Sequence, residues 1–267
     1  MLRTDGERLK ASLLEMAKIG ATPAGGVTRL SLTDADREAR DLFASWAREA
    51  DLEVRIDDVG SQYVRLAGTH PELAPVMVGS HLDTVPAGGR FDGALGVLVG
   101  LEVLRTLRDS GMRPRRSLEV ANFTNEEGAR FQPAVMASGV LAGRFTPEFV
   151  YSRTDRDGRS FGAELERIGY RGSVENRPKA IHAYIEVHIE QGPILEEEGL
   201  PLALVEGIVG IQWFDITLVG QSEHAGSSPM RRRRDPLVAA GRVVAGLRDL
   251  ALEYPDPVVV TVGRLQP

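Results

Sequence analysis

Apolar residues recur at helical spacing in three stretches of the first half of the chain. The spacing predicts helices over residues 5–19 and 34–50 and a largely buried helix over residues 94–109. Thr33 or Asp34 is the expected N-cap of the second helix. Short runs of apolar residues predict strands, over residues 53–57, 62–67, 76–80 and 117–124. Strands separated by helices are typical of an α/β domain with a substantially parallel sheet.

The pattern changes near residue 203. A long, apolar and β-branched run over residues 203–220 predicts paired strands. A helix is expected to begin at Asp235 or Pro236 and to run to about Tyr254. A strand over residues 257–265 should follow it. This order of strand, helix and strand resembles half of a small α+β domain.

Composition narrows the kinds of site and partner that the chain can have. Its 267 residues include no cysteine, so any metal must be held by imidazole and carboxylate groups. A net charge of -6 gives no reason to expect nucleic acid as a partner, and the basic run Arg231 to Arg234 is better explained as a solvated loop than as a phosphate site. We find neither a signal peptide nor a membrane span, and we therefore expect a cytoplasmic protein.

Polar residues stand where the predicted strands end, which is the edge where α/β sheets collect functional groups. His81 and Asp83 follow the strand over residues 76–80 and would point to the same side if the chain stayed extended. The Asp83 carboxylate could then accept the second imidazole N–H of a metal-binding His81. Asp92 lies in a glycine-rich loop directly before the buried helix, from which it could also reach a metal.

Two adjacent glutamates, Glu126 and Glu127, follow the buried strand over residues 117–124, where unpaired carboxylates are costly. A site with two metals would use one glutamate as a ligand and leave the other as a general base. His188, in the strand-like run AYIEVHI, supplies another imidazole. Each residue alone has an ordinary structural explanation, such as a helix start or a core histidine. Their joint occurrence at successive strand ends favours a zinc or manganese site.

Four motifs of the chain resemble the hydantoinase/carbamoylase branch of the M20-type metallohydrolases: HLDTVPAGGRFDG, NEEGARF, HIEQGPILE and GQSEHAGSSPM. That branch includes N-carbamoyl-L-amino acid hydrolases, β-ureidopropionases and allantoate amidohydrolases. The resemblance covers essentially the whole chain. It implies a zinc-peptidase-like catalytic domain over residues 1–208, incomplete here, with a mixed, largely parallel sheet flanked by helices. Residues 209–267 would form the first part of a small α+β lid or dimerisation domain.

The resemblance also implies a set of metal ligands. His81 and His188 would bind one divalent ion, Glu127 would bind a second, and Asp92 would bridge the two. Zinc or manganese is expected, with cobalt and nickel as alternatives. The family pattern further implies a homodimer in the full-length protein.

The remaining roles concern the reaction. Glu126 would act as the general acid and base, and Asp83 as the partner of His81. Gln191 would contact the substrate, and His224 would stabilise the oxyanion, often from the neighbouring subunit. The reaction implied is hydrolysis of a C–N bond in an N-carbamoyl (ureido) amino acid, by water activated between two metal ions. The products would be an amino acid, carbon dioxide and ammonia.

Several alternatives remain open at this point. The run NEEGARFQPAVMASGVLAG favours carbamoylases and ureidopropionases over allantoate enzymes, and the motif HIEQG favours the amidase branch over M20 peptidases. Members of the resembled family continue beyond residue 267, where they supply a last histidine ligand and the lid asparagine and arginine that hold the substrate. No histidine follows His224 here. A truncated, catalytically inactive remnant that binds at most one metal firmly is therefore a further hypothesis.

Overall fold

The computed structural model describes residues 2–254 and 258–266. Two compact units, Met1–Pro201 and Leu202–Pro267, divide the chain, and each is described by itself. The boundary after residue 208, between a catalytic domain and a lid or dimerisation domain, stays a prediction. Among the helices of the described residues, none is both long and apolar enough to cross a membrane.

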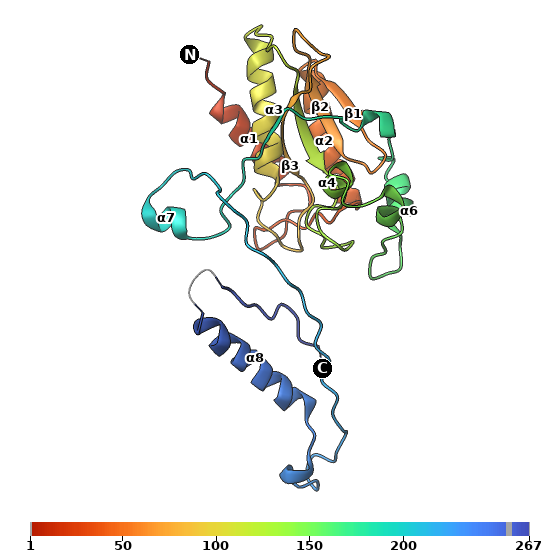
Figure 1. The fold of residues 1–267 in the computed structure, drawn as a ribbon, viewed down its shortest axis with the longest axis vertical. Coiled ribbons are helices and arrows are strands. Elements are labelled where there is room, and N and C mark those ends of the chain that lie inside the picture. Colours follow the sequence, from red (N-terminus) through yellow and green to blue (C-terminus); the bar gives the residue numbers. More distant parts are fainter. Residues whose placement is uncertain (1, 255–257, 267) are drawn as a thin grey trace. The chain divides into compact units, whose positions relative to one another are not determined.

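The first unit contains a five-stranded sheet in the order β1-β2-β4-β3-β5. Its strands are β1 (Glu53–Ile56), β2 (Gln62–Leu66), β3 (Val76–His81), β4 (Leu118–Phe123) and β5 (Ala183–Ile185). Strand β3 runs parallel to both β4 and β5, whereas β2 runs antiparallel to both β1 and β4. The predicted mixed sheet flanked by helices is confirmed (Figure 1). The run AYIEVHI forms a shorter strand than predicted, because only its first three residues pair with β3.

The helices predicted over residues 5–19, 34–50 and 94–109 are confirmed, and the pattern did not predict the short helices between residues 136 and 198. The helices are α1 (Gly6–Met16), α2 (Asp34–Glu49), α3 (Ala94–Asp109), α4 (Met136–Leu141), α5 (Pro147–Tyr151), α6 (Phe161–Arg167), α7 (Ile194–Glu198) and α8 (Pro236–Leu252), with short 3-10 helices η1 (Val174–Asn176) and η2 (Met230–Arg232). Thr33 caps α2, because its hydroxyl oxygen accepts the Asp36 N–H at 3.3 Å.

The main core lies between the sheet and helices α1, α2 and α3. Val64 and Val120 of the sheet pack there against Leu98 and Leu101 of α3. Figure 1 shows α3 lying along the sheet beside β3. A second core joins α4, α5 and α6 to the loop that follows β4, where Phe131 packs edge-on against the α6 residue Phe161. These two cores fix the loops that end β3 and β4.

A buried ion pair connects α2 to the loop after β4. Asp36 and Arg40 are both fully buried, with 2.8 Å between Oδ2 and Nε. The Arg40 guanidinium also donates to the Gly60 carbonyl oxygen at 2.8 Å and to the Thr124 hydroxyl at 3.2 Å. Because Thr124 directly follows β4, this pair helps to hold the start of the loop that carries Glu126.

In the second unit, α8 is confirmed and begins at Pro236, where the Asp235 carboxylate accepts the N–H groups of Leu237 and Val238. The predicted strands over residues 203–220 are wrong for this structure, since the described chain forms no strand there. The predicted strand over residues 257–265 begins outside the described residues, and residues 258–265 form no strand.

The physical reason for both errors is the same. A run of β-branched and apolar residues indicates side chains that suit a pleated, half-buried surface. A strand also needs a hydrogen-bonding partner for its main-chain N–H and C=O groups. In this structure most apolar side chains of the run remain exposed, Ile208 by 89% and Trp213 by 87%. Without burial against a partner strand, the pattern alone does not form a sheet.

Replacing Asp36 by alanine tests the buried ion pair. We expect Asp36→Ala to lower the free energy of unfolding by about 3–5 kcal/mol, because it leaves the Arg40 guanidinium buried without its counter-charge. Urea unfolding followed by circular dichroism measures the change. The matched control is Asp34→Ala in the same helix turn, which removes an exposed pair with Arg167 and should change stability far less. Equal losses in the two variants would contradict the account.

Candidate metal centre

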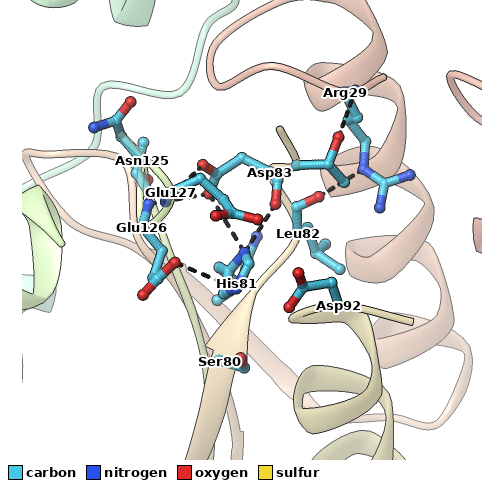
Figure 2. Close-up of polar contacts among 12 residues, drawn as sticks. Arg29, Ser80, His81, Leu82, Asp83, Asp92, Asn125, Glu126 and Glu127 are labelled. Carbon is cyan, nitrogen blue, oxygen red and sulfur yellow. Dashed lines mark hydrogen bonds and ion pairs between the residues drawn. The ribbon is translucent and has the colours of Figure 1, made fainter. Parts of the chain in front are cut away.

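The predicted site residues of the first unit gather where β3 and β4 end. The two strands are parallel, with His81 opposite Phe123, so the loops that follow them leave the same edge of the sheet. His81 is 2% exposed. Its Nε2 lies 3.4 Å from Oε2 of Glu126, and Figure 2 shows the Glu126 and Glu127 side chains near this ring.

The contact between His81 and Asp83 differs from the predicted one. The Nδ1 atom of His81 lies 2.8 Å from the main-chain carbonyl oxygen of Asp83 and 3.9 Å from its carboxylate. That carboxylate accepts instead the main-chain N–H groups of Glu126 and Glu127, at 3.2 and 3.3 Å. The alternation rule does not reach Asp83, because β3 ends at His81. Asp83 thus fixes the glutamate loop as well as the imidazole ring.

Arg29 is a supporting residue that the sequence pattern does not reveal. It is 1% exposed, and its Nε donates to the Leu82 carbonyl oxygen at 2.6 Å. Its Nη1 donates to the carbonyl oxygens of Met16 and Ile19 at the end of α1. Figure 2 shows the Arg29 guanidinium beside Leu82, the residue that joins His81 to Asp83 along the chain. A buried arginine that binds only carbonyl oxygens leaves no local signal, because its partners are main-chain groups.

Asp92 and His188 complete a group of potential ligands with His81. One ligand atom from each residue lies within 4.8 Å of those from the other two. His188 Nε2 is 3.3 Å from Asp92 Oδ1, and Gln191 donates its amide N–H to Asp92 Oδ2 at 2.6 Å. An imidazole, carboxylate and imidazole set at this spacing suits a divalent ion such as zinc.

The residue next to Asp92 explains how the loop comes so near to His81. Gly93 has a φ of +64°, and a Cβ atom added to it would lie 2.5 Å from ring atoms of His81. Both the backbone conformation and the close approach therefore require glycine at this position. Helix α3 begins at Ala94, directly after Gly93, so the position of this helix sets the position of Asp92.

His224 belongs to the second unit. Its Nδ1 accepts the main-chain N–H groups of Gly226 and Ser227, both at 3.0 Å. A neutral ring that accepts at Nδ1 carries its proton at Nε2, which makes Nε2 a hydrogen-bond donor. The role predicted for His224 in the reaction stays a prediction.

Comparison with known proteins decides the family of the chain. The profile of peptidase family M20/M25/M40 matches residues 77–263. The chain belongs to this family. The match includes every predicted site residue of this M20-family chain, from His81 to His224.

Individual relatives place the chain in the predicted branch. It is 48% identical to an N-carbamoyl-L-amino-acid amidohydrolase of Rhizobium meliloti over 98% of this chain and 63% of that protein. An allantoate amidohydrolase of Bacillus subtilis is 35% identical, over 94% of this chain and 61% of that protein. A crystal structure of an amidase of the hydantoinase/carbamoylase family from Burkholderia vietnamiensis gives a TM-score of 0.81 at 46% identity, over 94% of this chain and 61% of that one. The chain thus spans less than two thirds of the length of these relatives.

Burial and nearby carboxylates raise the pKa values of three site residues in this M20-family chain. Burial, with Asp92 and Asp83 nearby, raises the pKa of Glu127 to about 7. Burial likewise raises the pKa of Asp83 to about 6. Burial opposes protonation of His81, but the negative charges of Asp83 and Glu126 outweigh it and raise the pKa of the ring. The site therefore retains protons that a cation would displace.

One carboxylate oxygen shows that the residues fit a divalent ion. Oε1 of Glu127 is buried and has no hydrogen-bond partner among the described residues. A buried carboxylate oxygen without a donor is unfavourable unless a cation or another donor completes it. The donors nearby are imidazole nitrogens and carboxylate oxygens, which zinc and manganese accept. Family and structure together indicate that the chain uses a divalent metal.

The raised pKa of Glu127 predicts how stability depends on pH in the metal-free chain. An unfolded glutamate titrates near about 4.3. The folded chain binds this proton more tightly, with a pKa of about 7. Glu127 therefore favours the fold at low pH, and this contribution is lost as pH rises from about 4 to about 7. In Glu127→Gln the loss should be absent.

Urea unfolding of both proteins in excess chelator, between about pH 5 and 8, measures this effect. The free energy of unfolding of the unmodified chain should fall relative to that of Glu127→Gln as pH rises. A difference that stays constant with pH would contradict the assignment. Glu148→Gln, an exposed substitution in α5, serves as the control and should follow the unmodified chain at every pH.

Proposed function

We propose that this chain carries the metal site and the general base of an amidohydrolase that cleaves a C–N bond in N-carbamoyl (ureido) amino acids. The observation that carries the proposal is the group formed by His81, Asp92 and His188, whose ligand atoms lie within 4.8 Å of one another. The 48% identity to an N-carbamoyl-L-amino-acid amidohydrolase supports the substrate class. A cytoplasmic location and a homodimer belong to the same proposal.

The proposed ligands divide between two divalent ions, zinc or manganese, with cobalt and nickel as alternatives. His81 and His188 would hold one ion, Glu127 would hold the other, and Asp92 could serve both. The buried, unpartnered oxygen of Glu127 supports its role as a ligand. When bound, such ions supply Lewis acidity, which favours deprotonation of water near neutral pH and polarises a carbonyl group.

Glu126 is the proposed general base and acid. Its side chain is 35% exposed, and one of its oxygens lies 3.4 Å from His81. It can therefore meet water and substrate beside the metal ligands, while Asp83 holds its main chain. Glu126 takes a proton from the attacking water as the new C–O bond forms at the ureido carbonyl. It returns that proton to the leaving nitrogen as the C–N bond breaks.

Gln191 and His224 are the remaining residues with proposed roles in the reaction. Gln191 is the proposed substrate contact, and its hydrogen bond to the Asp92 carboxylate beside the proposed metal ligands supports that role. The Nε2–H of His224 is the proposed donor to the oxyanion, because its Nδ1 is used as an acceptor. The complete reaction consumes one water and releases an amino acid, carbon dioxide and ammonia.

An allantoate-type amidohydrolase is the second candidate. It is favoured by the 35% identity to an allantoate amidohydrolase of Bacillus subtilis. The lower identity places it behind the carbamoylase assignment. Allantoate is also a ureido compound, so the same metal site and the same general base would serve it.

A substrate panel with one variant tests the proposal. The chain is loaded with zinc or manganese and supplied with N-carbamoyl-L-amino acids, allantoate or dipeptides, and release of ammonia or amino acid is measured. We expect turnover of N-carbamoyl substrates. Glu126→Gln should keep its metal content and lose turnover by about 10²–10⁴-fold, because only the proton transfer is removed.

Glu148→Gln is the control and should behave as the unmodified chain. Metal loss in Glu126→Gln would mean that Glu126 and Glu127 exchange roles. Turnover of dipeptides alone would contradict the amidohydrolase assignment. One bound ion or none, without turnover of any substrate, would instead support the inactive remnant.

A further inference from the structure

His188 lies just beyond the part of β5 that pairs with β3. In that pairing, Val76 stands opposite Ala183 and Val78 stands opposite Ile185. Continued to the end of β3, the same register brings His188 opposite His81. The ladder ends at Ile185, however, and residues 186–192 make no main-chain hydrogen bond to other main-chain groups among the described residues. Another contact must therefore hold His188 beside His81.

A side-chain contact spans this gap. The buried Ser80 donates its hydroxyl to Oε1 of Glu186 at 2.6 Å. Tyr184 donates its phenol hydroxyl to Oε2 of the same carboxylate at 2.7 Å. Ser80 directly precedes His81, and Glu186 lies two residues before His188. One carboxylate thus connects the two chain segments that carry the imidazoles.

Helix α3 supports the same segment from a third direction. A Cβ atom added to Gly96 would lie 2.7 Å from the Val187 carbonyl oxygen and 2.8 Å from the Ser80 Cβ. The helix backbone therefore approaches both Ser80 and Val187 closely. This contact limits how far residue 187 can move toward the helix, but it cannot stop the segment from moving away from β3. The bond between Ser80 and Glu186 opposes that movement.

We propose that Glu186 is a positioning residue, whose carboxylate, bound by Ser80 and Tyr184, keeps His188 in register with His81. Both imidazoles can then serve one metal ion. The inference rests on the metal site proposed above and adds a residue that does not itself bind the metal. A hydrogen-bonded acceptor is sufficient for this role, and a negative charge is not required.

Metal affinity of the whole chain tests this role directly. Titration with Zn²⁺ against a coloured chelator gives the dissociation constant for each variant. We expect Glu186→Ala and Ser80→Ala each to weaken binding by about 10–100-fold, as loss of supporting contacts to metal ligands does. The double variant should bind no more weakly than the weaker single variant, because both changes remove the same bond. Glu186→Gln should bind within a few-fold of the unmodified chain, since its amide oxygen still accepts from Ser80.

Two controls separate positioning from general damage. Glu175→Ala removes another serine–glutamate hydrogen bond, to Ser173, away from the metal centre, and should leave affinity unchanged. Thermal unfolding of the metal-free Ser80→Ala and Glu186→Gln variants should match that of the unmodified chain. His188→Ala provides the reference for the loss of a ligand.

Three results would overturn the inference while leaving the proposed metal centre in place. Unchanged affinity in Glu186→Ala and Ser80→Ala would show that the contact positions nothing. Equal losses in Glu186→Gln and Glu186→Ala would show that the charge acts, as it would in a ligand. Additive losses in the double variant would show two independent roles. If His188→Ala binds zinc as the unmodified chain does, the proposed metal centre itself fails and the inference falls with it.

Discussion

The crowding of carboxylates around one buried imidazole is the constraint on which the rest of this structure depends. Asp83, Glu126 and Glu127 all approach His81 at the ends of β3 and β4. Like charges so close together repel, and burial removes the water that would screen them. The raised pKa values of Glu127, about 7, and Asp83, about 6, express the same cost. Two divalent cations would offset that cost and supply the unpaired Glu127 oxygen with a partner.

Strand pairing and loop contacts hold His81 and the carboxylates together despite the repulsion between the carboxylates. Parallel pairing of β3 with β4 brings both strand ends to one edge, and pairing with β5 brings a third segment toward it. Supporting contacts then fix the loops, since Arg29 binds the Leu82 carbonyl oxygen and the Asp83 carboxylate binds the glutamate loop. Close packing of α3 at Gly93 completes the arrangement. Each of these contacts joins groups of the chain itself, so together they hold the loops that carry the site residues.

The sequence predicted the helices and strands of the first unit up to residue 124, because their signals are local, but it did not predict α4 to α7. Each of the four strands expected up to residue 124 is present, with ends within one residue of those predicted. The convergence of His81, Asp92 and His188 was also expected from sequence, although His188 lies beyond the end of β5 and not within a strand. Their chemical roles remain predictions.

What the sequence could not predict depends on tertiary contacts. The turn of the chain after His81 redirects the Asp83 carboxylate, and no local pattern marks that turn. Arg29 acts through main-chain carbonyl oxygens, which every residue has. The strands expected over residues 203–220 are absent for a related reason, because strand formation requires a partner that a local pattern cannot supply.

The central claim is that His81, Asp92 and His188 bind one divalent ion. X-ray diffraction from zinc-soaked crystals of the chain, collected at the zinc absorption edge, tests it most directly. We expect an anomalous peak at about 2.0–2.2 Å from an imidazole nitrogen of His81, an oxygen of Asp92 and an imidazole nitrogen of His188. A fully zinc-soaked crystal with no peak at these residues, or with its peak elsewhere, would contradict it.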